Sequence, residues 1–99
     1  MADTLELAEA ICSLIRAAPT PTPISLMNHD ANGAAEIIGA VVERCHLEGI
    51  ELAQIKMDPD LALELGLTAG SALPHGSLPT IALEEGLGRQ LKFVRANCP

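Results

Sequence analysis

Residues 24–66 read ISLMNHDANGAAEIIGAVVERCHLEGIELAQIKMDPDLALELG, and this stretch decides the expected fold. Two short runs, Ile24–Asn28 and Ile50–Met57, have the length and composition of strands. Between them, Gly33–Glu48 carries apolar residues at helical spacing, with its glutamates pointing away from them. Two strands joined by a crossover helix are expected to be parallel, so the stretch predicts an α/β unit.

The ends of the helices in this stretch carry recognisable signals. Asp30 or Asn32 is suited to cap the first of them, and Gly49 is suited to end it. After the second strand, Asp58 predicts another helix cap, a proline follows at the first helical position, and Gly66 ends the helix. Both helices are therefore bounded by local sequence.

A further helix is predicted before this stretch. Asp3 or Thr4 can cap it, and Pro19 ends it. Its apolar residues are expected on one face: Leu7, Ala8, Ile11, Cys12, Leu14, Ile15 and Ala18. The alternating prolines of residues 19–23 predict a stiff connector to the sheet.

Two more strands are predicted after it. A long loop, Leu67–Leu78, leads to a strand over Pro79–Glu85, and a glycine-containing turn leads to another over Arg89–Arg95. A short connection of this kind predicts an antiparallel hairpin. We expect residues 1–99 to form a single α/β domain, a two- or three-layer sandwich with three helices and a mixed sheet of about four strands.

Composition excludes several functional classes. Thirteen acidic residues against six basic ones give a net charge of −7, which argues against nucleic acid and anionic membrane surfaces as partners. The acidic residues near the N-terminus do not suit a signal peptide, and no run approaches the roughly 18 apolar residues of a membrane span. We therefore expect a cytoplasmic protein.

The cysteines and histidines do not form a recognisable site in the sequence. Cys12 and Cys45 fall on apolar helix faces, where cysteine behaves as a small hydrophobic residue, and Cys98 lies in the tail. The spacing of these residues matches neither a disulfide framework nor a metal-binding motif. We expect no metal site and no cofactor.

The order of elements resembles the thioredoxin-like fold, and the resemblance is sharpest at Leu78-Pro79-Thr80. In that family a cis-proline within a hydrophobic–Pro–Thr sequence opens the first hairpin strand and faces the active-site loop. The resemblance covers roughly Leu5 to Val94 and implies that the loop from His29 to Gly33 occupies the active-site position.

The chain departs from the thioredoxin-like pattern in ways that bear on function. No cysteine lies between Met27 and Val42, so the family's redox motif has no counterpart, and neither does its long final helix. The family's aromatic residues near the first strand are also absent. The resemblance therefore implies an architecture without the family's disulfide chemistry.

We expect a non-catalytic binding or protein-interaction domain, with a second copy of the chain or another protein as its partner. The alternative is a small enzyme or a small-anion-binding protein that uses the loop from His29 to Gly33 facing Leu78–Thr80. Polar residues at the carboxyl end of a strand, an exposed helix N-terminus and the long loop motivate this alternative. The candidate ligand-binding residues are His29, Asp30, Asn32, Gly33, His75, Pro79 and Thr80.

Overall fold

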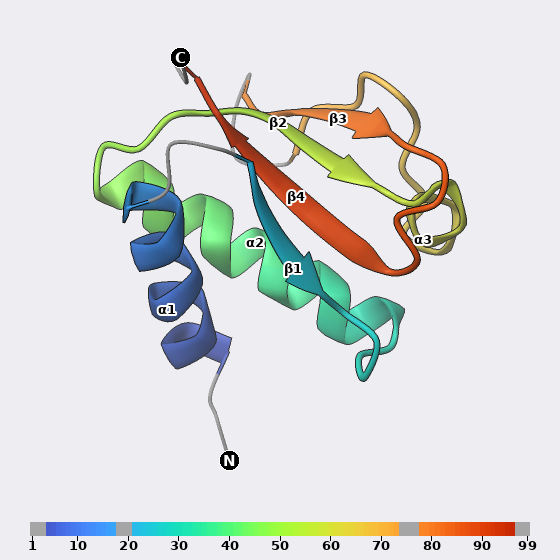
Figure 1. Cartoon of the computed structure of the whole chain (residues 1–99), viewed down its shortest axis with the longest axis horizontal. Coiled ribbons are helices and arrows are strands. Elements are labelled where there is room, and N and C mark those ends of the chain that lie inside the picture. The colour runs from blue at the N-terminus through green and yellow to red at the C-terminus, as the bar shows by residue number, and fades with distance from the viewer. Residues whose placement is uncertain (1–3, 18–20, 74–77, 97–99) are drawn as a thin grey trace.

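The computed structural model describes residues 4–17, 21–73 and 78–96 (Figure 1). Its elements are α1 (Thr4–Ala17), β1 (Thr22–Ser25), α2 (Ala31–Leu47), β2 (Leu52–Met57), α3 (Pro59–Glu64), β3 (Thr80–Leu83) and β4 (Gln90–Arg95). The expected α/β class, with three helices and a mixed four-stranded sheet, is confirmed.

Local side-chain bonds explain where the helices begin. The Asp30 carboxylate accepts a hydrogen bond from the backbone N–H of Gly33 at 2.7 Å, so Asp30 rather than Asn32 caps α2. Asp58 caps α3 in the same way, accepting from the N–H of Asp60 at 2.8 Å. Thr4 is the first described residue of α1, and Asp3, the other expected cap, lies outside the described residues. After α2, Gly49 turns the chain with a φ of +75°.

The strand order is β1-β4-β2-β3. β4 pairs antiparallel with both β1 and β2, and β2 pairs parallel with β3. β1 and β2 run in the same direction, as expected of strands joined by a crossover helix, although β4 lies between them. One detail differs from the expectation: β3 and β4 do not form a hairpin, because β2 lies between them.

The connection between β3 and β4 explains why these strands do not pair. It runs from Glu84 to Arg89 and crosses the end of β2. This connection is longer than the two to five residues of most hairpin loops. The N–H of Glu84 donates to the carbonyl of Met57, and the N–H of Gly88 donates to the carboxylate of Asp58. Both bonds hold the connection against the carboxyl end of β2.

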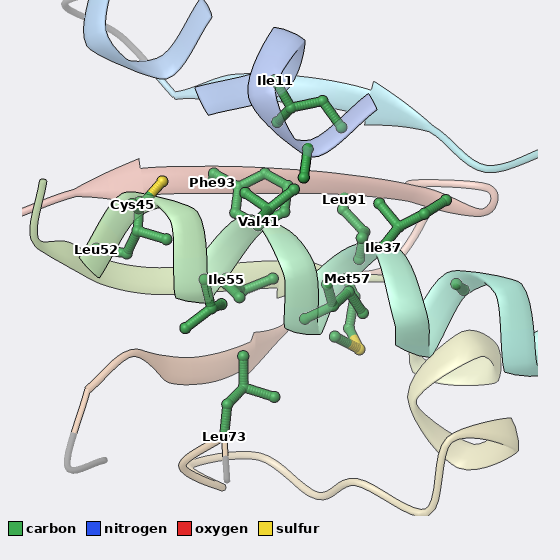
Figure 2. Close-up of a cluster of buried hydrophobic side chains, with 14 of the residues drawn as sticks. Ile11, Ile37, Val41, Cys45, Leu52, Ile55, Met57, Leu73, Leu91 and Phe93 are labelled. Atoms are coloured by element: carbon green, nitrogen blue, oxygen red, sulfur yellow. The ribbon is translucent and has the colours of Figure 1, made fainter. Parts of the chain in front are cut away.

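The hydrophobic core lies on one face of the sheet. Burial alternates along β4, where Leu91 and Phe93 are fully buried and their neighbours are only partly so. Ile55 and Met57 of β2 lie on the same face, and Figure 2 shows these side chains gathered with others from α1 and α2. Phe93, the only aromatic residue of the chain, belongs to this core.

The opposite face of the sheet is covered by none of the three described helices. Its central residues are Gln54 and Lys56 of β2 and Lys92 and Val94 of β4, all partly exposed. The fold thus has two layers, helices on one side and a partly exposed sheet face on the other.

We expect Phe93→Ala to destabilise the protein strongly. Removing a fully buried aromatic ring costs about 3–5 kcal/mol, a large share of the roughly 5–15 kcal/mol that stabilises a typical domain. Urea unfolding followed by circular dichroism measures the loss. Val94→Ala, on the opposite face of the same strand, is the control and should cost less than about 1 kcal/mol. Equal losses in the two variants would contradict the assignment of faces.

Candidate functional site

Four of the predicted ligand-binding residues lie together. His29, Asp30, Asn32 and Gly33 form the junction between β1 and α2, at the carboxyl end of β1. The Asp30 side chain is engaged by the N–H of Gly33. The His29 imidazole makes no hydrogen bond to any described residue. It lies close to the start of α2, since a Cβ added at Gly33 would contact both Asp30 and His29.

The other predicted residues are not brought to this loop. Pro79 and Thr80 lie at the start of β3, on the opposite edge of the sheet from β1. Three strand spacings of about 4.8 Å separate these edges, about 14 Å in all. Because β1 and β3 run in the same direction, the end of β1 and the start of β3 also lie at opposite ends of the sheet. The two segments therefore do not face each other.

The Leu78–Pro79 peptide bond is cis, as the resemblance to the thioredoxin-like family implied. Pro79 is buried, while Thr80 forms an isolated bridge to Ala72 on the outer side of β3. His75 lies outside the described residues.

The residue that faces the loop at the end of β1 is Arg89. Its Nη2 donates to the carbonyl of His29 at 2.9 Å, and its Nη1 donates to both carboxylate oxygens of Glu64 in α3, at 3.0 and 3.2 Å. Its own carbonyl accepts from the N–H of Leu26 at 2.7 Å. Arg89 thus ties together three segments that are distant in the sequence: the end of β1, α3 and the start of β4.

The backbone of Arg89 is unusual for a residue with a side chain. Its φ is +56°, in the left-handed region that glycine normally occupies. This conformation costs on the order of 1 kcal/mol or more. The ion pair with Glu64 and the bond to the carbonyl of His29 hold the residue there.

Asp58 makes two different contacts at the same end of the sheet. One carboxylate oxygen caps α3 through the N–H of Asp60, and the other accepts from the N–H of Gly88 at 3.0 Å. We call His29, Asp58, Glu64, Gly88 and Arg89 the strand-end cluster. Its polar groups fasten the α2, α3 and β4 connections to one another.

A second group of charges lies on the partly exposed sheet face. Lys56 and Lys92, the only lysines of the chain, are direct cross-strand partners on that face. Like charges placed opposite each other repel. The Glu84 carboxylate lies 3.5 Å from the Lys56 Nζ and offsets part of this repulsion.

The described residues supply neither a metal-ligand cluster nor a membrane-spanning helix. Within residues 4–17, 21–73 and 78–96, no three His, Cys, Asp or Glu side chains gather as metal ligands would. No helix in these segments is long and apolar enough to cross a membrane.

No protein-family model matches the chain, and neither a curated protein nor a solved structure resembles it significantly. The arrangement of its own residues is therefore the basis for assigning a role. In the strand-end cluster the carboxylates cap helices or pair with an arginine, which are structural tasks.

The sequence carried no signal for the contacts of Arg89. Glu64 precedes it by 25 residues and the carbonyl of His29 by 60, so no spacing rule connects them. The positive φ of Arg89 could not be predicted either, because left-handed backbone is expected at the two glycines that precede it in the turn, Gly86 and Gly88.

We expect Asp58→Ala to be more costly than Asp30→Ala. Each substitution removes a helix cap, worth about 1 kcal/mol, but only Asp58 also accepts from Gly88. The added bond brings the expected loss for Asp58→Ala to about 2 kcal/mol in chemical denaturation. If the two variants lose the same stability, the Gly88 contact contributes nothing.

Proposed function

We propose that this chain is a non-catalytic protein-interaction domain that associates with a second copy of itself through α1. The observation that carries the proposal is an apolar stripe on α1 that is mostly exposed in the described structure, with only Leu7 partly buried against the core. The strand-end cluster supports the non-catalytic part, because its charged groups are engaged in holding the chain together.

The stripe consists of Leu7, Ala10, Leu14 and Ala17, which we call the α1 flank. Their spacing of three, four and three residues places them along one side of the helix. Leu14 is 55% exposed, although its apolar spacing predicted a core position. The residues of α1 that are buried form a neighbouring stripe: Ala8, Ile11, Cys12 and Ile15.

The α1 flank points away from α2. Arg16 of α1 pairs with Glu48 of α2, and Glu9 of α1 lies 3.6 Å from Arg44 of α2. Glu9 and Arg16 lie on the side of α1 opposite to Leu14 by helical geometry. The α1 flank therefore lies on the side of the helix away from α2, and β1 is the strand that α1 contacts.

The surroundings of the α1 flank favour a second copy as the occupant. Two chains that each carry a charge of −7 repel each other, so they associate most readily through a surface without charges. The α1 flank contains none, and residues 17–28, which include the whole of β1, contain none either. Electrostatic repulsion near the contact therefore opposes the burial of the α1 flank only weakly.

The chemistry of β1 directs the association to the helix rather than to the strand. The backbone N–H of Leu26 donates to the carbonyl of Arg89, next to β4. Because backbone polar groups alternate in direction along a strand, those of Pro23 and Ser25 point away from the sheet. Pro23 has no N–H to donate, which weakens the addition of another strand to this edge. Packing of α1 against its copy does not require such bonds.

A two-fold axis makes the α1 flank self-complementary. In an antiparallel pair of helices centred near Ala10, Leu7 of each copy lies opposite Leu14 of the other. The small side chain of Ala10 at the crossing point permits close approach. Such an isologous contact closes as a dimer.

The thioredoxin-like layout is part of the same proposal, in a restricted form. The order of elements and the cis bond before Pro79 support it. The order of strands does not, since β2 lies between the two strands that would form the hairpin. The alternative of an enzyme or anion-binding loop loses support, because the segments at His29 and Pro79 lie at opposite edges.

We expect Leu14→Glu to weaken self-association at least tenfold, as measured by sedimentation equilibrium over a range of concentrations. The substitution places a charge within an apolar contact, opposite Leu7 of the other copy. Leu63→Glu is the matched control, since Leu63 is 79% exposed on α3, away from the α1 flank, and it should leave the dimer unchanged.

The salt dependence provides a second readout. Because screening reduces repulsion between two acidic chains, raising the salt concentration from 0.05 to about 0.5 M should strengthen the dimer. A chain that stays monomeric at several hundred micromolar, or a Leu63→Glu variant that dissociates as readily as Leu14→Glu, contradicts the proposal.

A further inference from the structure

Two cysteines from different helices meet in the core. The Sγ atoms of Cys12 in α1 and Cys45 in α2 lie 3.6 Å apart, and both side chains are almost fully buried. Both are free thiols, with Cys45 donating a weak hydrogen bond to Cys12. Their positions on apolar helix faces explain their burial, but not their contact with each other.

We propose that Cys12 and Cys45 form an intramolecular disulfide when the protein meets a peroxide, and that this bond fastens α1 to α2. The sulfur atoms need to approach by about 1.5 Å to reach the S–S bond length of about 2.05 Å. The inference stands independently of self-association, because Cys12 lies on the side of α1 that faces α2.

Charged groups lie next to the sulfur pair. Cys12 donates to Oε2 of Glu48 at 3.6 Å, and the same carboxylate is held by Arg44, 2.7 Å away, and by Arg16. These groups come from the same two helices as the cysteines. The Cys12 thiol thus donates to a carboxylate, whereas within the described residues the Cys45 thiol donates to Cys12.

The environments of the two thiols set the order of reaction. Burial, together with the hydrogen bond to Cys12 and the charge of Cys12, raises the pKa of the Cys45 thiol to about 12. Cys45 therefore stays protonated at neutral pH. The first attack on the peroxide falls to Cys12, because the Glu48 carboxylate that contacts its thiol can accept the proton.

Access to the pair depends on α1. This helix packs mainly against α2, with a smaller contact to β1, so it can separate locally without opening the sheet. Reaction then occurs in the open form, and the disulfide traps the closed one. Because α1 must first separate from α2, oxidation should be slower than expected for two sulfur atoms that are already in contact.

The chemistry balances with hydrogen peroxide as the oxidant. The Cys12 thiol gives its proton to the Glu48 carboxylate, its sulfur attacks one peroxide oxygen, the O–O bond breaks, and the departing hydroxide takes that proton back to leave water and a sulfenic acid. Cys45 then attacks the Cys12 sulfur, the S–O bond breaks, and its proton leaves with hydroxide as a second water. Two thiols lose two electrons and two protons, and the peroxide is reduced to water.

The test uses the full chain and needs no substitution in the core. Trypsin cleavage after Arg16, Arg44, Lys56 and Arg95 places the three cysteines on separate peptides, residues 1–16, 45–56 and 96–99. After treatment with hydrogen peroxide and a non-reducing digest, mass spectrometry should find peptide 1–16 linked to peptide 45–56. Linkage of either peptide to 96–99, or recovery of both as free thiols or sulfinic acids, overturns the proposal.

A Cys98→Ser variant tests the fastening of α1. It keeps both core cysteines, so peroxide should remove two hydrogens from its mass and leave no free thiol. Closing a loop of this length between Cys12 and Cys45 should raise the Tm by on the order of 10 °C, and reduction should reverse the rise. A disulfide that forms without raising the Tm contradicts the fastening.

Discussion

The structure depends on β4 being paired along both of its edges. β1 and β2 make no ladder with each other, so β4 is the strand that joins them into one sheet. Its alternation of buried and partly exposed residues also places Leu91 and Phe93 beneath the helices. Because β4 is paired along both edges and also contributes core residues, it fixes the positions of the neighbouring strands and helices.

The elements of the fold were predictable because their signals are local. The caps at Asp30 and Asp58 and the glycine at Gly49 act within a few residues, and the apolar spacing of α2 reports its buried face directly. The order of the strands was not predictable in this way. A turn containing glycines resembles a hairpin in sequence, and only the contacts of Glu84 and Gly88 with the end of β2 show that the chain crosses over.

The candidate site was likewise predictable in its local features and not in the contacts that depend on the order of the strands. The sequence placed three polar residues and a glycine correctly at the junction of β1 and α2, since the end of a strand and the start of a helix are both local features. It could not show that Arg89 would be their neighbour and Pro79 would not, because that depends on which strands are adjacent. The polarity of this end of the sheet is accounted for by the bonds that hold Arg89 in a left-handed conformation.

The position of β4 has a consequence for how the chain reaches this structure. The strand that joins the sheet follows both of its neighbours in the sequence, so during synthesis β1 and β2 emerge before the partner that satisfies their edges. Almost all of the pairing is non-local, which slows folding and leaves backbone donors and acceptors unpaired in the meantime. The proline in β1 discourages pairing with foreign strands both in the unfinished sheet and at the edge of the finished one, whereas the charged lysine in β2 does so only before β3 and β4 have paired with that strand.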